Sequence, residues 1–323
     1  MTIPSQNPHV PAAFDRNWNL YLRIIAVAIG KGGVGKTTLA AILADLMHLA
    51  GLGKVLLMDF NNQANQCEEY DLSAGGRRED GSLVLDDGGR NLVTSIIAGT
   101  PLQPIEVPGR PGLYLSVGGP MIATLTGYLS QLKEGKDETL IAEALALIAH
   151  EYAAIIIDSP PENPAIQKAV LGAARYLIIP TKTDVSSWEK GIGAVAKEYM
   201  KIKTSTNPNL ELLGAVVTFT DELESGGTFA QTRSDIQAVI GDAGPVLERS
   251  VPHLESVAKL SRRYGLPVTA LERRAVEEGW PKTELQKIMK ISGAWAAVAT
   301  LLLQRLQECE ASAAAAVTAQ VTA

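Results

Sequence analysis

Cysteine and long hydrophobic runs are both scarce in this chain, and each scarcity excludes a class of protein. The 2 cysteines among 323 residues, Cys67 and Cys309, lie far apart and fit no disulfide framework or metal-ligand spacing. No apolar run reaches the ~18 residues that a membrane-spanning helix needs. Residues 1–19 are polar and contain proline, without the apolar segment of a secretory signal. We therefore expect a cytoplasmic protein whose thiols stay reduced.

An excess of basic charge is also missing. The formal net charge is −6 at pH 7, which argues against a surface coated with lysine and arginine. A local basic patch is still compatible with this charge, because the field at a surface depends on how the charges are distributed. With 46% hydrophobic residues and a mean hydropathy of +0.09, the chain has enough apolar side chains for a substantial core. Its length suits one large α/β domain or two small ones.

The most informative stretch is a glycine-rich segment, residues 30–38, between a predicted strand over 24–29 and a predicted helix over 39–50. Glycines allow consecutive backbone N–H groups to turn inward, and the helix N-terminus adds a partial positive charge. Lys36 can then reach the β and γ phosphates of a nucleotide, and the Thr37 hydroxyl can ligate Mg²⁺. The candidate nucleotide-binding residues of this phosphate loop are Gly32, Gly33, Val34, Gly35, Lys36, Thr37 and Thr38.

Two predicted strands end in a carboxylate. The apolar run over 153–157 suits a central parallel strand covered on both faces, and it ends at Asp158. Such a strand places Asp158 at the carboxyl edge of the sheet beside the phosphate loop, where open α/β sheets bind ligands. Asp158 is therefore a candidate to contact Mg²⁺ through water. The strand over 55–58 ends in the same way, at Asp59.

The order of the predicted elements favours one fold class. Strands and helices alternate along the chain, which predicts a doubly wound α/β domain with a mostly parallel sheet flanked by helices. We assign this domain to residues 21–309 and expect residues 1–20 to form a flexible arm. A long terminal helix is predicted over 281–307, and residues 310–323 are expected to be a disordered Ala-rich tail.

A second lysine, Lys31, makes the loop more specific. The sequence Lys-Gly-Gly-Val-Gly-Lys-Thr-Thr, 31–38, resembles the deviant Walker A motif of the ParA/MinD family of ATPases. The resemblance implies a P-loop NTPase fold, ATP and Mg²⁺ as cofactors, and an ATP-dependent homodimer in which Lys31 reaches the nucleotide of the partner subunit. It is strongest toward ParA-type (Soj-like) partition ATPases without an N-terminal helix-turn-helix domain. Sequence-specific operator binding is accordingly not expected.

The segment after Asp59 departs from the family pattern Asp-x-Asp-Pro-Gln-Gly-Asn-x-Thr. Asp59, Gln63 and Asn65 match it, whereas Asn61 replaces the second aspartate, which in the family positions or activates the attacking water. Asparagine can hold a water molecule but cannot accept its proton. We therefore expect slow hydrolysis; the alternative is turnover like that of relatives, because a base contributes only ~10²–10⁴-fold. The resemblance implies the catalytic residues Lys31, Lys36, Asp59 and Asn61, and the Mg²⁺ site Thr37, Asp59 and Asp158.

The late predicted strand, 246–253, resembles the family strand whose following turn lines the adenine pocket, which makes Pro252 a candidate contact. In relatives, arginines after this strand and in the helix before it contact the DNA backbone. The candidates here are Arg233, Lys259, Arg262 and Arg263. The cluster has no interleaved aromatic residues, which argues against stacking on single strands. Phosphate contacts to double-stranded DNA without base readout fit best.

The resemblance also implies partners and a function. A ParA-type ATPase would bind non-specific DNA on the nucleoid as a dimer and be released when a ParB-like centromere-binding protein stimulates hydrolysis. The end of the chain lacks the basic amphipathic helix of MinD-type relatives, with no Lys or Arg after Arg305, so no membrane partner is expected.

Two further functions remain open: an ATPase that positions another cargo on the nucleoid, and a metabolic enzyme of the same fold. Among metabolic enzymes, nitrogenase-reductase-type proteins need cluster cysteines that the two cysteines here cannot supply. Dethiobiotin-synthetase-like ligases lack the early lysine.

Overall fold

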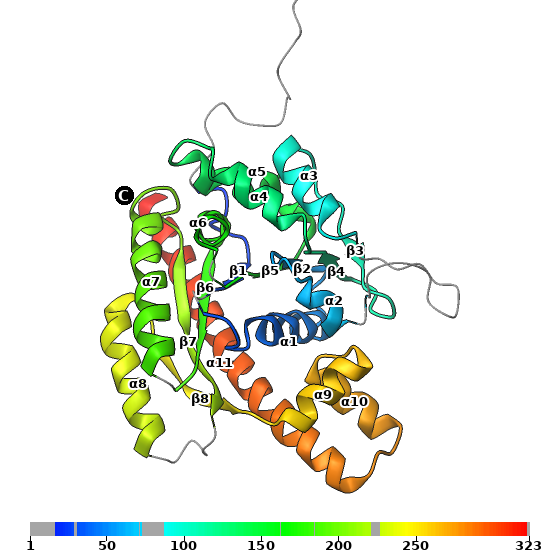
Figure 1. Cartoon of the computed structure of the whole chain (residues 1–323). Helices are drawn as coiled ribbons and strands as arrows, with labels where there is room; N and C mark the ends of the chain where they lie inside the picture. Colours follow the sequence, from blue (N-terminus) through cyan, green and yellow to red (C-terminus); the bar gives the residue numbers. More distant parts are fainter. Residues whose placement is uncertain are drawn as a thin grey trace, which may run out of the picture.

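The computed structural model describes residues 17–28, 31–70, 72, 87–161, 163–183, 185–220 and 227–321. Within these residues the chain forms one sheet in the order β3-β4-β2-β5-β1-β6-β7-β8, shown in Figure 1. All neighbouring strands are parallel except β3 and β4, which are antiparallel. The strands are β1 (Ile24–Val27), β2 (Val55–Asp59), β3 (Ile105–Glu106), β4 (Leu113–Ser116), β5 (Ala154–Asp158), β6 (Tyr176–Thr181), β7 (Glu211–Thr220) and β8 (Val246–Pro252). The predicted doubly wound α/β fold is confirmed.

Helices cover both faces of the sheet, which explains why the central strands are apolar throughout. In β1, Ile24 and Ala26 belong to the core under α3–α8, whereas Ile25 and Val27 belong to the core under α1 and α9–α11. The helices are α1 (Lys36–Leu49), α2 (Asn65–Glu69), α3 (Arg90–Ala98), α4 (Ile122–Leu129), α5 (Lys136–Ala146), α6 (Pro164–Ala173), α7 (Val185–Thr204), α8 (Gly227–Ile240), α9 (Glu255–Tyr264), α10 (Val268–Glu277) and α11 (Lys282–Val321). None of the described helices is long and apolar enough to span a membrane.

The strand order reverses at β1, and this point places the site. After β1 the chain passes through α1 to β2, which lies on one side of β1 in the sheet. The later strand β6 lies on the other side of β1. Ligands of open α/β sheets bind in the crevice at such a switch point, outside the carboxyl ends of the strands. The phosphate loop follows β1 directly. Asp158 ends β5, the neighbour of β1, and Asp59 ends β2, the next strand in the sheet.

The terminal helix is longer than the sequence predicts. Instead of ending at Gln307, α11 continues as a helix to Val321, through the Ala-rich segment that was expected to be disordered. Alanine has the highest helix propensity, so continuing the helix through this segment costs little. Arg23 next to β1 pairs with both carboxylate oxygens of Glu310, at 2.6 and 3.0 Å. Cys309 beside it is buried, so α11 is anchored to the domain beyond its predicted end.

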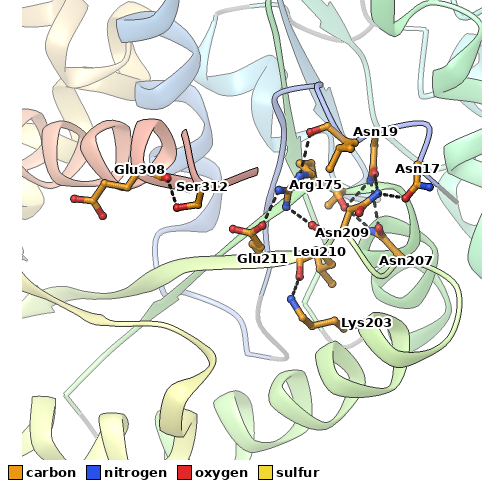
Figure 2. Close-up of polar contacts among 12 residues, drawn as sticks. Asn17, Asn19, Arg175, Lys203, Asn207, Asn209, Leu210, Glu211, Glu308 and Ser312 are labelled. Carbon is orange, nitrogen blue, oxygen red and sulfur yellow. Dashed lines mark hydrogen bonds and ion pairs between the residues drawn. The ribbon is translucent and has the colours of Figure 1, made fainter. Parts of the chain in front are cut away.

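Part of the expected N-terminal arm is also packed on the domain. Residues 1–16 lie outside the described part of the chain, but 17–21 form turns, and Asn19 is fully buried. The Asn19 amide donates to the carbonyl of Ala174 at 3.1 Å and its oxygen accepts from Asn209 at 3.2 Å (Figure 2). In the same network the buried Arg175 pairs with Glu211 at 2.6 Å. The ordered domain therefore includes residues 17–20.

Candidate nucleotide site

The phosphate loop adopts a conformation that requires glycine. Gly33 and Gly35 have φ angles of 69° and 81°, in the left-handed region that other residues rarely adopt. A Cβ atom on Gly35 would also lie 3.0 Å from the Phe219 ring. The buried Lys36 side chain curls back over the loop, and its Nζ donates to the Lys31 carbonyl at 2.8 Å. The loop is therefore closed around the lysine, as a phosphate-binding loop requires.

The sheet holds the loop at Val34. The Thr218 hydroxyl, on β7, lies 2.8 Å from the Val34 carbonyl oxygen and 3.0 Å from that of Thr181 on β6, and it shares its proton between them. The Val34 side chain is fully buried in the core, so Val34 anchors the loop rather than lining the cavity in front of it. The sequence did not single out Thr218 or Thr181 for this contact.

A cavity of about 480 Å³ opens in front of the loop, a volume that suits a nucleotide-sized ligand. The residues that line it include predicted site residues from early and from late parts of the domain sequence. They are Gly32, Gly33, Gly35, Lys36, Thr37, Thr38, Asn61, Pro252 and Arg262. The far wall is built by α9 and α11, including Val257 and Trp295. Lys31 lies in the loop as a half-exposed residue, and its side chain is outside the cavity lining.

Two fully buried carboxylates lie beneath the cavity. Asp59 and Asp158 are paired neighbours on β2 and β5. Asn61 joins them, because its Nδ2 donates to Asp59 Oδ1 at 2.9 Å and to Asp158 Oδ2 at 3.0 Å. Asn61 is therefore a neutral hydrogen-bond donor between two carboxylates. The aspartate of the family pattern would instead place a third carboxylate beside them.

The electrostatics of this pair suit a divalent cation. Burial, and then the charge of Asp59, raise the pKa of Asp158 above its ordinary value. Hydrogen bonds from Thr37 and Gln66 act in the opposite direction and favour its ionised form. Mg²⁺ takes one or two protein carboxylates and completes its shell with hydroxyl, phosphate and water oxygens. Asp59, Asp158 and Thr37 fit that donor set, and no group of three or more His, Cys, Asp or Glu among the described residues offers a different metal site.

The structure places another polar residue at this site, Gln66 on α2, which sequence reasoning missed. Gln66 is fully buried and donates from Nε2 to Asp158 Oδ2 at 3.0 Å and to the Thr37 carbonyl at 3.1 Å. Its backbone N–H donates to Asp59 Oδ2 at 3.0 Å. It stands at the variable position of the family segment, so neither the motif nor periodicity could have signalled it.

The predicted DNA-binding residues lie on two separate elements. Lys259, Arg262 and Arg263 are exposed on α9, and Lys259 and Arg262 lie 3.7 and 4.0 Å from Glu255 on the same helix. Arg233 is instead half-buried on α8 and donates to the Val246 carbonyl of β8 at 3.1 Å. The buried apolar side chains of α8 belong to the core on one face of the sheet, whereas Val257 of α9 belongs to the core on the other face. The structure therefore brings together three of the four predicted residues.

Comparison with known proteins places the chain in a family. A family model described as an AAA domain matches residues 22–212, more than half of the chain. The chromosome-partitioning ATPase Soj of Thermus thermophilus is 31% identical over 201 residues, which cover 62% of this chain and 70% of Soj. The chain belongs to the ParA/MinD family. Membership of this family agrees with the loop, the two strand-end carboxylates and the sheet order described above.

Solved structures of other proteins share the fold of this chain. The structure of pNOB8 ParA bound to nonspecific DNA has a TM-score of 0.58 and 17% identity, covering 89% of this chain and 99% of that chain. Cobyrinic acid a,c-diamide synthase from Mycobacterium smegmatis, solved with a bound ATP analogue and magnesium, has a TM-score of 0.55 and 26% identity. It covers 76% of this chain and 93% of that chain.

Proposed function

We propose that this protein is a ParA-type DNA partition ATPase, in which ATP controls binding to non-specific DNA. The observation that carries the proposal is the position of α9. The helix forms a wall of the nucleotide cavity through Val257 and Arg262, and it presents Lys259 and Arg263 to solvent. A ligand in the cavity would contact the element that carries the basic residues. Such a contact supplies the difference in affinity between states that any nucleotide switch requires.

The residues of the site suit slow ATP hydrolysis. The loop N–H groups and Lys36 would bind the phosphates, while Thr37, Asp59 and Asp158 would hold Mg²⁺, which neutralises charge on the phosphate oxygens. Asn61 lines the cavity and can orient a water molecule, but its amide cannot accept the proton of that water. Phosphoryl transfer depends mainly on positioning and electrostatics, so one missing carboxylate slows turnover without abolishing it.

Dimerisation and a partner complete the proposed cycle. Lys31 would reach the nucleotide of a second subunit, so that two copies enclose two ATP molecules and present two α9 helices to double-stranded DNA. A ParB-like centromere-binding protein would stimulate hydrolysis and release the dimer. The protein would act in the cytoplasm, associated with the nucleoid.

The affinity for double-stranded DNA in three nucleotide states tests the proposal. At fixed salt, we expect tight binding with ATP and Mg²⁺, and binding at least tenfold weaker with ADP or without nucleotide. Salt must be held constant because phosphate contacts make affinity strongly salt-dependent. Equal affinity in all three states would contradict a nucleotide switch.

A metabolic enzyme is the second candidate, and the 26% identity to a diamide synthase is what favours it. The two candidates differ in what stimulates hydrolysis. DNA and a centromere-binding protein should accelerate the partition ATPase, whereas turnover of a metabolic enzyme should depend on a small carboxylate substrate and ignore DNA.

A further inference from the structure

Gln66 contacts each of the three candidate magnesium ligands. Its side-chain amide donates to Asp158 and to the Thr37 carbonyl, and its backbone N–H donates to Asp59, all within 3.1 Å. These three residues come from β5, α1 and β2, which are separate elements. One fully buried residue on the short helix α2 therefore links the three elements that would form the metal site.

The orientation of the Gln66 amide follows from its neighbours. The Thr37 carbonyl oxygen can only accept a hydrogen bond, so the Gln66 atom that faces it must be the NH₂ group, which also lies 3.0 Å from Asp158 Oδ2. The other atom of the amide is then the oxygen, Oε1. It is buried, and no donor in the described part of the chain reaches it.

The cluster therefore has a buried acceptor that no described residue satisfies. Gln66 Oε1 is buried without a donor among the described residues, although buried polar atoms of native proteins are nearly always paired. A hydrated cation supplies what is missing, because its water molecules donate hydrogen bonds while its charge offsets the carboxylates. A residue that holds the ligands and accepts from such a water would belong to the outer shell that orients a metal ion.

We infer that Gln66 is a positioning residue for magnesium. Its donors hold Thr37, Asp59 and Asp158 in register, and its Oε1 accepts a hydrogen bond from a water molecule of the ion. The inference rests on the proposed function, since it assigns a role toward the metal of the same nucleotide site. The Gln66 position lies outside the residues to which the family motif gives a role.

The test measures ADP affinity with magnesium and with a chelator, in the native protein and in Gln66→Leu. Native protein should bind ADP more tightly with magnesium. The substitution removes the side-chain donors and the acceptor while it keeps the backbone N–H, so the gain from magnesium should fall by about 10- to 100-fold. Affinity without magnesium should change little. Gln131→Leu, an identical change at an exposed position after α4, should keep the native gain.

The outcomes separate this inference from the proposed function. If native protein shows no gain from magnesium, the metal site itself is wrong and the proposed function fails. If magnesium increases the ADP affinity of Gln66→Leu as much as that of native protein, only the role of Gln66 is overturned. Gln66→Met keeps the length of the side chain and serves as the second variant if leucine prevents folding; it should also lose the gain. A purely structural role would weaken ADP binding equally with and without magnesium.

Discussion

Asn61 shows how a single amide changes the charge of a site. It donates to both buried aspartates, and an aspartate at this position would instead place a third carboxylate within hydrogen-bonding distance of each of them. Like charges at such distances disfavour ionisation, most strongly where water is excluded. We therefore expect Asn61 to lower the repulsion in the metal-free site and, under the proposed function, to leave the attacking water without a proton acceptor at this position.

Asn61→Asp should therefore change two properties in opposite directions. With Mg²⁺ and ATP, turnover should rise by at least tenfold, because a positioned base contributes about 10²–10⁴-fold. With a chelator, the variant should unfold at a lower urea concentration than native protein. Asn62→Asp makes the same change one residue away at an exposed position and should affect neither measurement. Equal or lower turnover in Asn61→Asp would show that the asparagine is incidental or compensated.

The buried Asp158 predicts a pH dependence of the metal-free protein. Burial and Asp59 raise its pKa from 3.8 to about 7 in the folded state. Between about pH 4 and pH 7 the folded protein therefore keeps a proton that the unfolded chain has released. The free energy of unfolding should fall as pH rises through this window, by at most about 1.4 kcal/mol per pH unit, and level off above pH 7.

Asp158→Asn should remove this part of the pH dependence, because asparagine does not titrate. Urea unfolding of both proteins at pH 5 and pH 8, in a chelator and without nucleotide, measures the difference. Native protein should lose more stability than the variant between the two pH values. Parallel losses would mean that Asp158 ionises normally in the folded protein.

At the scale of elements, a buried acid fastens α10 to the nucleotide-binding helix. Asp45 on α1 is fully buried, accepts from the Thr269 hydroxyl at 2.6 Å, and pairs with Arg110 and Arg273. The Arg110 side chain is only 13% exposed, whereas that of Arg273 is 41% exposed. The two arginines therefore contribute differently to the same contact, since solvent screens the exposed pair.

Arg110→Ala should lower the free energy of unfolding by about 3 kcal/mol, because it leaves a buried carboxylate without its closest cation. Arg273→Ala should cost less than about 1 kcal/mol. Urea denaturation of the two alanine variants provides the comparison, and each serves as the matched control of the other. Equal costs would contradict the ranking by burial.

The sequence predicts the central elements better than the peripheral ones. Apolar runs such as 153–157 identify a central strand because burial on both faces leaves no room for alternation. The end of α11 was missed because the apolar stripe stops near Leu306, and the helix continues on alanine propensity and the Arg23–Glu310 pair. Such a pair joins residues far apart in the chain, so no local pattern announces it.

In the candidate site, too, local sequence patterns predict some residues and long-range contacts determine others. Glycine spacing and the strand-end aspartates predict the phosphate loop and the acidic pair, because these depend on contiguous residues. The role of Gln66 depends on three elements that meet only in the fold. The separation of Arg233 from α9 also depends on the fold, since a shared positive charge does not place two helices side by side.

At the scale of the whole molecule, Lys31 predicts the assembly. Lys31→Ala should leave ATP binding largely intact, because Lys36 and the loop N–H groups of the same subunit bind the phosphates. It should prevent the ATP-dependent dimer on a sizing column. Lys36→Ala, as the contrasting variant, should abolish ATP binding itself. Dimers of Lys31→Ala equal to those of native protein would contradict a role across the interface.

Binding to DNA should depend on the exposed face of α9. Arg262 also lines the nucleotide cavity, so the cleaner variant is Lys259→Ala with Arg263→Ala. We expect weaker binding to duplex DNA and a salt dependence that flattens by about 0.9 for each phosphate that the variant no longer neutralises. Lys133→Ala with Lys197→Ala removes the same charge from exposed positions on other elements and should leave both measures near native. Unchanged affinity of the α9 variant would place the DNA-binding surface elsewhere.

The burial of both thiols has a practical consequence for labelling the protein in solution. Cys67 and Cys309 are each 5% exposed, and burial raises the pKa of Cys309 to about 11, so neither should react readily with a maleimide. A single cysteine introduced at the exposed Ser256 of α9 could then carry a fluorophore in an otherwise native background. Emission from that dye would test whether the surroundings of α9 change when a nucleotide binds, with the unmodified protein as its own labelling blank.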